Sequence, residues 1–135
     1  VIIYYSGHGD HMSGIEYWQL PDGHLDQKNI ATLVNEIENN SVVYLFSESC
    51  SSAHLCNTHL ATKKYVSIGA TQDYEDAIMT CDGGVMTMNI LNILSSKSEN
   101  FTLRNLWDSM LNENVEIEHF SIRYSDEHLL DETLF

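Results

Sequence analysis

Two apolar runs that each end abruptly in polar residues constrain this chain more than any other feature. The first is Val-Ile-Ile-Tyr-Tyr at residues 1–5, and the second is Val-Val-Tyr-Leu-Phe at residues 42–46. Runs of Val, Ile, Tyr and Phe without polar alternation are typical of strands that are covered on both faces, as in a parallel sheet. The sequence therefore predicts two buried strands of an α/β protein.

The segment between the two runs predicts a helix. Over residues 26–38, apolar side chains recur at the spacing that gives one apolar helix face. These side chains are Ile30, Leu33, Val34 and Ile37. Strand, helix and strand in this order form a right-handed crossover, which makes the two strands parallel. Their carboxyl ends should then lie at the same edge of the sheet, where open α/β folds place their sites.

The rest of the chain predicts further elements of the same fold in one domain over residues 1–135, because a chain of this length holds one modest core. The predicted elements are strands at 65–70 and 118–125, helices at 83–94 and from the cap Thr102 onward, and a turn with a short helix at 51–62. Residues 10–25 contain three Gly or Pro residues and are expected to form a loop or short hairpin.

Each of the first two predicted strands ends at a residue type that is used in catalysis. His8 follows the first strand between two glycines, and Cys50 follows the second within a polar Ser-Cys-Ser-Ser stretch. Because the two strand ends share an edge, we expect His8 and Cys50 to meet. An imidazole can deprotonate a thiol to the nucleophilic thiolate and can later protonate a leaving amine. The pair therefore indicates acyl transfer at a carbonyl group.

The motifs around these two residues are similar to those of the caspase-like cysteine peptidases, and most closely to the metacaspases. Tyr-Ser-Gly-His-Gly at residues 5–9 resembles the histidine box of that family, and Glu-Ser-Cys-Ser-Ser at residues 48–52 resembles its Asp-Ser-Cys-x-Ser-Gly box. Residues 14–22 and 83–87 extend the resemblance. It implies a caspase-like three-layer α/β/α fold with a mainly parallel sheet, lacking its first two strands in this chain.

The resemblance also implies a cysteine endopeptidase with His8 and Cys50 as its catalytic pair. The N–H groups of Gly9 and Cys50 would form the oxyanion hole that stabilises the negative oxygen of the intermediate. Glu48 and Asp73 match the acids of the pocket for the residue before the cut bond. Two carboxylates there would pair with a guanidinium or ammonium group. The expected partners are therefore proteins and peptides with Arg or Lys before the cut bond.

Two other interpretations come from different classes of protein. A catalytically inactive caspase-like domain could serve as a regulatory or interaction module, but such a module needs neither His8 nor Cys50. A flavodoxin-like binding domain would need a Gly-rich phosphate loop after a strand, which the sequence lacks. The intact pair of His8 and Cys50 therefore favours the enzyme.

Charge and cysteine content limit the other partners. The chain has 20 acidic and 6 basic side chains and a net charge of −14, which disfavours nucleic acid and anionic membrane surfaces. The three cysteines are Cys50, Cys56 and Cys81. They lack the spacing of a disulfide framework or of a zinc site. No apolar run approaches the ~20 residues of a membrane helix. We expect a cytoplasmic protein, and we expect it to be a monomer.

No cofactor is expected to be required, and no metal ligands are assigned from the sequence. Calcium, which many metacaspases use, would need a set of oxygen ligands, but no run of this chain resembles a recognised calcium loop. The acids after the histidine box are expected to be solvated loop residues. They are Asp10, Glu16, Asp22 and Asp26.

Overall fold

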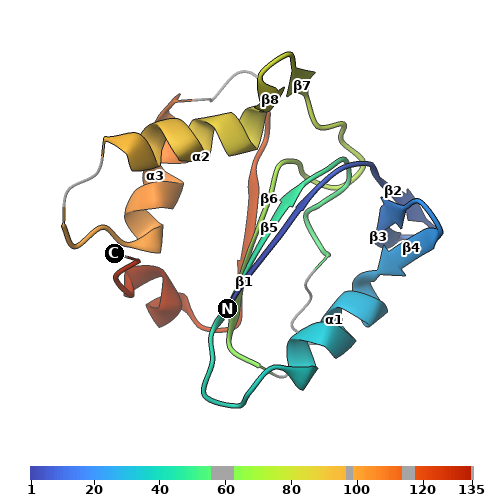
Figure 1. The fold of residues 1–135 in the computed structure, drawn as a ribbon, viewed down its shortest axis with the longest axis horizontal. Helices are drawn as coiled ribbons and strands as arrows, with labels where there is room; N and C mark the ends of the chain where they lie inside the picture. The colour runs from blue at the N-terminus through green and yellow to red at the C-terminus, as the bar shows by residue number, and fades with distance from the viewer. Residues whose placement is uncertain (56–62, 97–98, 114–117, 135) are drawn as a thin grey trace.

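The computed structural model describes residues 1–55, 63–96, 99–113 and 118–134 and shows a mixed α/β architecture (Figure 1). Its central sheet has the strand order β1-β5-β6-β9. Strands β1 (Ile2–Ser6), β5 (Val43–Glu48) and β6 (Tyr65–Gly69) are parallel, and β9 (Ser121–Tyr124) runs antiparallel to β6. The predicted α/β class with a mainly parallel sheet is therefore confirmed.

Helices cover both faces of this sheet and give three layers (Figure 1). Helix α1 (Gln27–Glu36) lies on one face. Helices α2 (Val85–Ser95) and α3 (Leu103–Glu113) and the 3₁₀-helix η1 (Glu127–Asp131) lie on the other. Each helix in the described part of the chain is too short or too polar to span a membrane.

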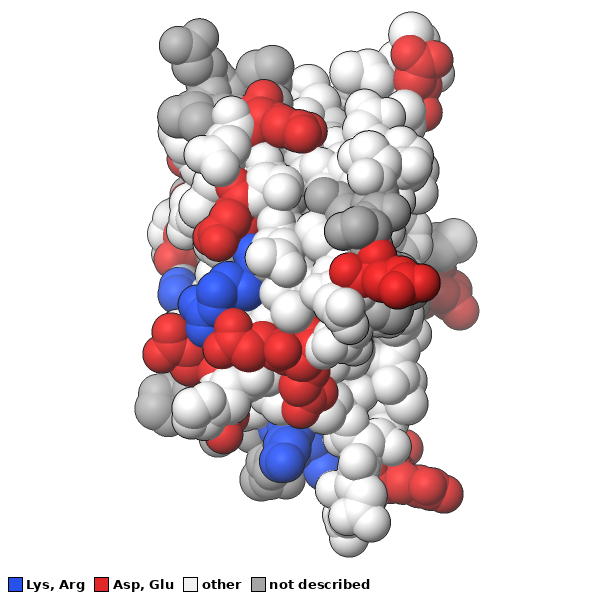
Figure 2. All heavy atoms as spheres, turned by 90° about the vertical axis from the view of Figure 1, so that its left-hand side faces the viewer, with Lys and Arg blue, Asp and Glu red and all other residues white. Residues whose placement is uncertain are grey.

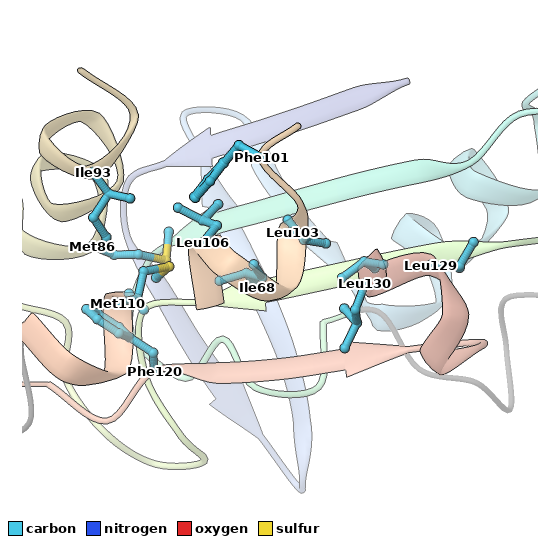
Figure 3. Close-up of a cluster of buried hydrophobic side chains, with 12 residues drawn as sticks. Ile68, Met86, Ile93, Phe101, Leu103, Leu106, Met110, Phe120, Leu129 and Leu130 are labelled. Carbon is cyan, nitrogen blue, oxygen red and sulfur yellow. The ribbon is translucent and has the colours of Figure 1, made fainter. Parts of the chain in front are cut away.

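The side chains of β5 alternate between two apolar clusters because successive residues of a strand point to opposite faces. Val43 and Leu45 are fully buried in the cluster that contains α1, whereas Tyr44 and Phe46 pack against the cluster that contains α2 and α3. Figure 3 shows the second, larger cluster, in which side chains from α2, α3 and η1 meet Ile68 of β6. Both faces of β5 are thus covered, as its unbroken apolar run predicted. The predicted burial of the first run is wrong on one face, because β1 lies at the edge of the sheet and its Ile2 and Tyr4 are 72% and 52% exposed.

Reciprocal hydrogen bonds begin two of the helices. At α1, the Asn29 N–H donates to the Asp26 carboxylate at 2.9 Å, and the Asp26 N–H donates to the Asn29 side chain at 3.2 Å. Thr102 and Asn105 make the same exchange at α3, at 3.2 and 3.0 Å. Such a capping box satisfies two N–H groups that a helix terminus leaves unpaired. The predicted Thr102 cap is confirmed, while Asp26 is a cap and not merely a solvated acid.

Helix α1 is shorter than the predicted span 26–38 and buries most of its predicted apolar face. Ile30 and Val34 are buried and Ile37 packs against the same cluster, but the Leu33 side chain is 47% exposed. The expected burial of Leu33 is therefore wrong. The structure describes a turn over residues 51–55, and the rest of the helix predicted within 51–62 lies outside the described residues, as does Cys56.

Residues 10–25 contain more regular structure than the expected loop or short hairpin. Strands β2 (Gly9–Met12), β3 (Ile15–Leu20) and β4 (Gly23–Asp26) form a separate antiparallel sheet in that order. The turn between β2 and β3 consists of Ser13 and Gly14, with φ angles of 54° and 79°. Two residues with positive φ suit a tight hairpin, because their backbone twist matches that of the strands. The Gly and Pro residues thus mark turns between strands.

Aromatic side chains attach this small sheet to the central one. The Trp18 indole N–H donates to the Ser47 hydroxyl at 2.7 Å, and the Trp18 ring stacks on Tyr5 with centroids 4.6 Å apart. Trp18 is 4% exposed, so the bond lies inside the protein. The contact fixes the start of β2, and with it the residues that follow β1.

Candidate active site

The ends of β1 and β5 lie side by side. Their register pairs Ser6 with Glu48, the last residues of the two strands, and the Gly7 N–H donates to the Glu48 carbonyl oxygen at 3.1 Å. His8 and Cys50 each lie two residues beyond this pair. The structure therefore brings the two predicted catalytic residues to the same edge of the sheet on neighbouring chain segments.

Gly9 packs its backbone directly against Cys50. A Cβ atom built on Gly9 would lie 2.3 Å from the Cys50 carbonyl oxygen and 2.9 Å from the Ser49 side chain. These distances are far below a van der Waals contact, so only glycine allows the two segments to approach this closely. The two residues expected to supply the oxyanion hole are thus in contact through their backbones.

The backbone of His8 is fixed, but its ring is not. The His8 carbonyl oxygen accepts hydrogen bonds from the Gln19 N–H at 2.8 Å and from the Tyr5 hydroxyl at 2.7 Å. The His8 side chain is exposed. Within the part of the chain that the structure describes, the imidazole makes no hydrogen bond, and none joins it to Cys50. The ring is therefore free to rotate toward or away from the thiol.

The Cys50 thiol is half-buried and faces the segment that follows β6. Its Sγ atom accepts a hydrogen bond from the Ala77 N–H at 3.3 Å. Burial raises the pKa of the Cys50 thiol, the Ala77 N–H lowers it less, and the Asp76 carboxylate raises it further. The thiol is consequently protonated at neutral pH in this arrangement, and nucleophilic attack requires a base that takes its proton.

The backbone of the cysteine box is fixed by the chain that follows β6. The Ser51 N–H donates to the Glu75 carbonyl oxygen at 2.9 Å, and Ser51 has a φ of 47°. Ser52 is buried and exchanges hydrogen bonds with Thr71, at 3.2 Å from its N–H and 3.1 Å to its hydroxyl. Polar partners on the chain after β6 thus hold Ser52 in place.

The Glu48 carboxylate lies inside the protein at the start of α2. It is 2% exposed, and its Oε2 accepts hydrogen bonds from the N–H and the hydroxyl of Thr87 at 2.6 and 2.7 Å. A negative charge at a helix N-terminus is favoured by the unpaired N–H groups there. Gly84, which precedes the helix, leaves the space that the carboxylate fills. Among the described residues, Glu48 Oε1 has no hydrogen-bond partner.

A second buried carboxylate, Glu118, was not predicted from the sequence. It is 6% exposed, and its Oε1 accepts a hydrogen bond from the Ile78 N–H, while its Oε2 has no partner among the described residues. Burial, with a smaller contribution from the charge of Glu48, raises the pKa of Glu118 to about 7. The sequence carried a signal for this burial, because Glu118 lies two residues before the inward-facing Phe120 and alternate residues of an extended segment share a face.

Asp73, the other predicted pocket acid, belongs to a different group of side chains. Its Oδ1 lies 2.5 Å from His54 Nδ1, and the His54 N–H donates to Glu16 Oε2 at 2.6 Å. No described contact joins Asp73 to Glu48. The structure thus places the two predicted substrate-binding acids in separate hydrogen-bond groups. The sequence analysis did not single out His54.

Glu16 corrects the expectation that the acids after the histidine box are solvated. It is 4% exposed, and burial raises its pKa to about 8, while the His54 N–H lowers it less. Asp10 and Asp22 are exposed as expected. The alternation of β3 explains the difference, because Glu16 and Trp18 share the inward face of that strand.

Acidic groups dominate the surface as the net charge of −14 requires. On the face that carries α2 and α3, red carboxylates are widespread and blue groups are few (Figure 2). Arg104 is engaged by Asp131 at 2.6 and 3.1 Å and by Glu127 at 3.5 Å. A surface of this net charge favours cationic over anionic ligands.

Comparison with known proteins shows that the fold of this chain is similar to that of a solved structure. No protein-family model matches the chain, and no curated protein matches it. Among solved structures, the crystal structure of protein GSU0716 from Geobacter sulfurreducens is similar, with a TM-score of 0.73 and 16% sequence identity. The alignment covers 98% of this chain and 69% of that one. At this identity the likeness shows a shared α/β fold.

Proposed function

We propose that this protein is a cysteine endopeptidase of the caspase-like kind that cleaves after Arg or Lys. The observation that carries the proposal is the parallel register of β1 and β5, which sets His8 and Cys50 two residues beyond paired strand ends. The contact between Gly9 and the Cys50 backbone supports it. The caspase-like architecture and the roles of individual residues are part of this proposal.

The proposed reaction uses His8 as the base and Cys50 as the nucleophile. The imidazole takes the thiol proton, and the thiolate attacks the carbonyl carbon of the peptide bond. The N–H groups of Gly9 and Cys50 stabilise the negative oxygen of the tetrahedral intermediate. The imidazolium then protonates the leaving amine, and water hydrolyses the resulting thioester. The raised pKa of the thiol makes a rotatable, exposed His8 ring necessary for the first step.

A basic side chain before the cut bond fits the charges near Cys50. Glu48 precedes Cys50 by two residues, and Asp76 lies close enough to raise the pKa of the thiol. The two arginines of the chain are bound elsewhere: Arg104 pairs with Asp131, and Arg123 donates to His54. A substrate aspartate would therefore be repelled by the exposed Asp76 carboxylate and by the buried charge of the Glu48 side chain behind it, whereas a guanidinium or ammonium group would be attracted.

Fluorogenic peptides that end in Arg, Lys or Asp test the proposal, each with and without calcium. We expect cleavage after Arg and Lys that is lost in Cys50→Ala and in His8→Ala. The matched control is Cys81→Ala, which removes an exposed thiol and should retain full activity. Activity that survives Cys50→Ala would eliminate the proposed nucleophile, and cleavage after Asp would eliminate the proposed specificity.

A catalytically inactive interaction module is the second candidate. The hydrogen bond from the Ala77 N–H to the Cys50 thiol, together with an unbound His8 ring, favours it. The rate of alkylation by iodoacetamide at pH 7 separates the two functions, because an activated thiol reacts faster than an ordinary one. Equal rates at Cys50 and Cys81, together with no cleavage of any peptide, would favour the module.

A further inference from the structure

A small cavity with a concentration of metal-binding side chains lies beside the cysteine box. Its volume is about 30 Å³, enough for one ion or water molecule. The residues that line it are His11, Gly14, Glu16, His54, Asp73 and Tyr74. They come from the β2–β3 hairpin, from the turn after Cys50 and from the segment after β6. None of them belongs to the proposed catalytic pair.

Three of these side chains converge on one point. The ligand atoms of Glu16, His54 and Asp73 all lie within 4.8 Å of one another. His54 Nδ1 is 2.5 Å from Asp73 Oδ1 and 3.9 Å from Glu16 Oε1. A tetrahedral ion with bonds of about 2.0–2.2 Å holds its ligand atoms roughly 3.4 Å apart. Small rotations of the side chains would therefore bring all three atoms to bonding distance.

His11 lines the same cavity but does not belong to the group of three converging ligand atoms. Its Nδ1 lies 3.1 Å from the Ser51 hydroxyl, and its ring meets Tyr74 edge-on at a centroid distance of 4.3 Å. These contacts hold the ring beside the cavity. The fourth position of a tetrahedral ion at the three converging atoms would therefore be open to a water molecule.

The burial of Glu16 independently indicates a cation. Its side chain is 6% exposed, and a buried carboxylate is costly unless a positive charge accompanies it. A bound ion would neutralise both carboxylates at once.

Arg123 is the group that competes with an ion. Its Nη2 lies 2.8 Å from His54 Nε2, so His54 carries its proton on Nδ1 and accepts a bond from Arg123. An ion at Nδ1 moves the imidazole proton to Nε2, and the guanidinium must then turn away. Arg123 is exposed on β9 and has room to do so. Removal of Arg123 should therefore strengthen metal binding.

We propose that Glu16, His54 and Asp73 bind a divalent transition-metal ion of the zinc class. One imidazole and two carboxylates are ligands that Zn²⁺ accepts in tetrahedral geometry, with a water molecule in the fourth position. Ca²⁺ prefers six to eight oxygen atoms and is a poor match. The ion would join the β2–β3 hairpin to the cysteine box and to the chain after β6. The site does not depend on the proposed peptidase activity.

Titration calorimetry of the chain with Zn²⁺ alone tests the site, and Co²⁺ absorption reports its ligands. We expect one tight site with a tetrahedral nitrogen-and-oxygen spectrum. His54→Ala and Asp73→Asn should each weaken binding by at least about 10-fold. The exposed residues His24 and Asp22 supply matched controls, and His24→Ala and Asp22→Asn should bind as the unchanged chain does. Arg123→Gln should bind more tightly.

Circular dichroism shows whether each variant is folded, and Asp73→Asn serves as the conservative test because its side chain is 44% exposed. The proposal is overturned if the chain does not bind Zn²⁺, or if His54→Ala and Asp73→Asn bind as the controls do. A sulfur-to-cobalt charge-transfer band would place the ion on a cysteine and would also overturn it.

Discussion

The two histidines that flank the cysteine box differ in how they are held. His8 has a fixed backbone but an exposed ring without a hydrogen bond, whereas the His54 ring is held by Asp73 on one nitrogen and Arg123 on the other. Catalysis by His8 requires a ring that rotates between the thiol and the leaving group. Metal binding by His54 requires a ring that stays in place. The difference therefore separates a residue suited to proton transfer from one suited to ligation.

Replacement of His8 by alanine should have the largest effect on activity. Comparison with His54→Ala tests whether the two histidines have separate roles. His8→Ala should lower kcat/KM on Arg peptides by at least about 1,000-fold, because the residues of a catalytic pair act as a unit. His54→Ala should lower it less than about 10-fold, because His54 makes no described contact with Cys50. Equal losses in the two variants would show that the histidines do not have separate roles.

The pH dependence of the unfolding free energy should report the burial of Glu16, whose carboxylate accepts a hydrogen bond from the His54 N–H. Glu16 has a folded-state pKa of about 8, above its ordinary value of 4.5. The folded protein therefore holds more protons than the unfolded chain between pH 4.5 and 8, and stability falls as pH rises through this range. Glu16→Gln should reduce that slope by up to about 1.4 kcal/mol per pH unit.

Urea unfolding at pH 5, 6.5 and 8 measures this slope in both proteins. Glu118, with a pKa raised to about 7, contributes in the same direction and should leave a residual slope in Glu16→Gln. Saturating Zn²⁺ should flatten the dependence of the unchanged chain if the metal replaces the Glu16 proton. A slope unchanged by Glu16→Gln would contradict the burial of this carboxyl group.

The close approach of Gly9 to Cys50 should appear as a loss of stability. Gly9→Ala places a methyl group 2.3 Å from the Cys50 carbonyl oxygen and should cost about 1–3 kcal/mol of unfolding free energy. Gly14→Ala is the control at a residue with positive φ and nothing within 4 Å, and its cost is about 1–2 kcal/mol of backbone strain alone. Only Gly9→Ala should also abolish cleavage.

The smallest expected effect concerns the cap that Glu48 forms on α2. Thr87→Val removes the hydroxyl that lies 2.7 Å from Glu48 Oε2 but keeps the N–H bond to the same atom. The loss of one hydrogen bond should cost about 0.5–1.5 kcal/mol of unfolding free energy, because the second bond to the same oxygen atom remains. Thermal unfolding of Thr87→Val beside Thr87→Ser measures it, and equal stabilities would argue against the cap.

The α/β architecture followed from patterns that depend only on neighbouring residues. The apolar runs predicted β1 and β5, and the helix between them predicted their parallel pairing, which the register confirms. The small sheet β2-β3-β4 was missed because its Gly and Pro residues were interpreted as one loop. The alternation around Trp18, which buries Glu16 on the same face, was the signal that could have revealed it.

The side-chain groups of the site could be predicted only in part. Motifs singled out His8 and Cys50, but they gave no indication that the Ala77 N–H binds the thiol. Asp73 resembled a pocket acid, while its actual partner, His54, lies 19 residues away in the sequence. Such partners are set by how segments pack after folding, and no local pattern encodes them.

The most direct test of the central claim is the site of covalent capture by a peptidyl chloromethyl ketone that ends in arginine. Mass spectrometry of the digested adduct identifies the cysteine whose sulfur has displaced the chloride. We expect modification of Cys50 in the unchanged chain and its loss in His8→Ala. Modification of Cys56 or Cys81 instead, or labelling of Cys50 that is equally fast in His8→Ala, would contradict it.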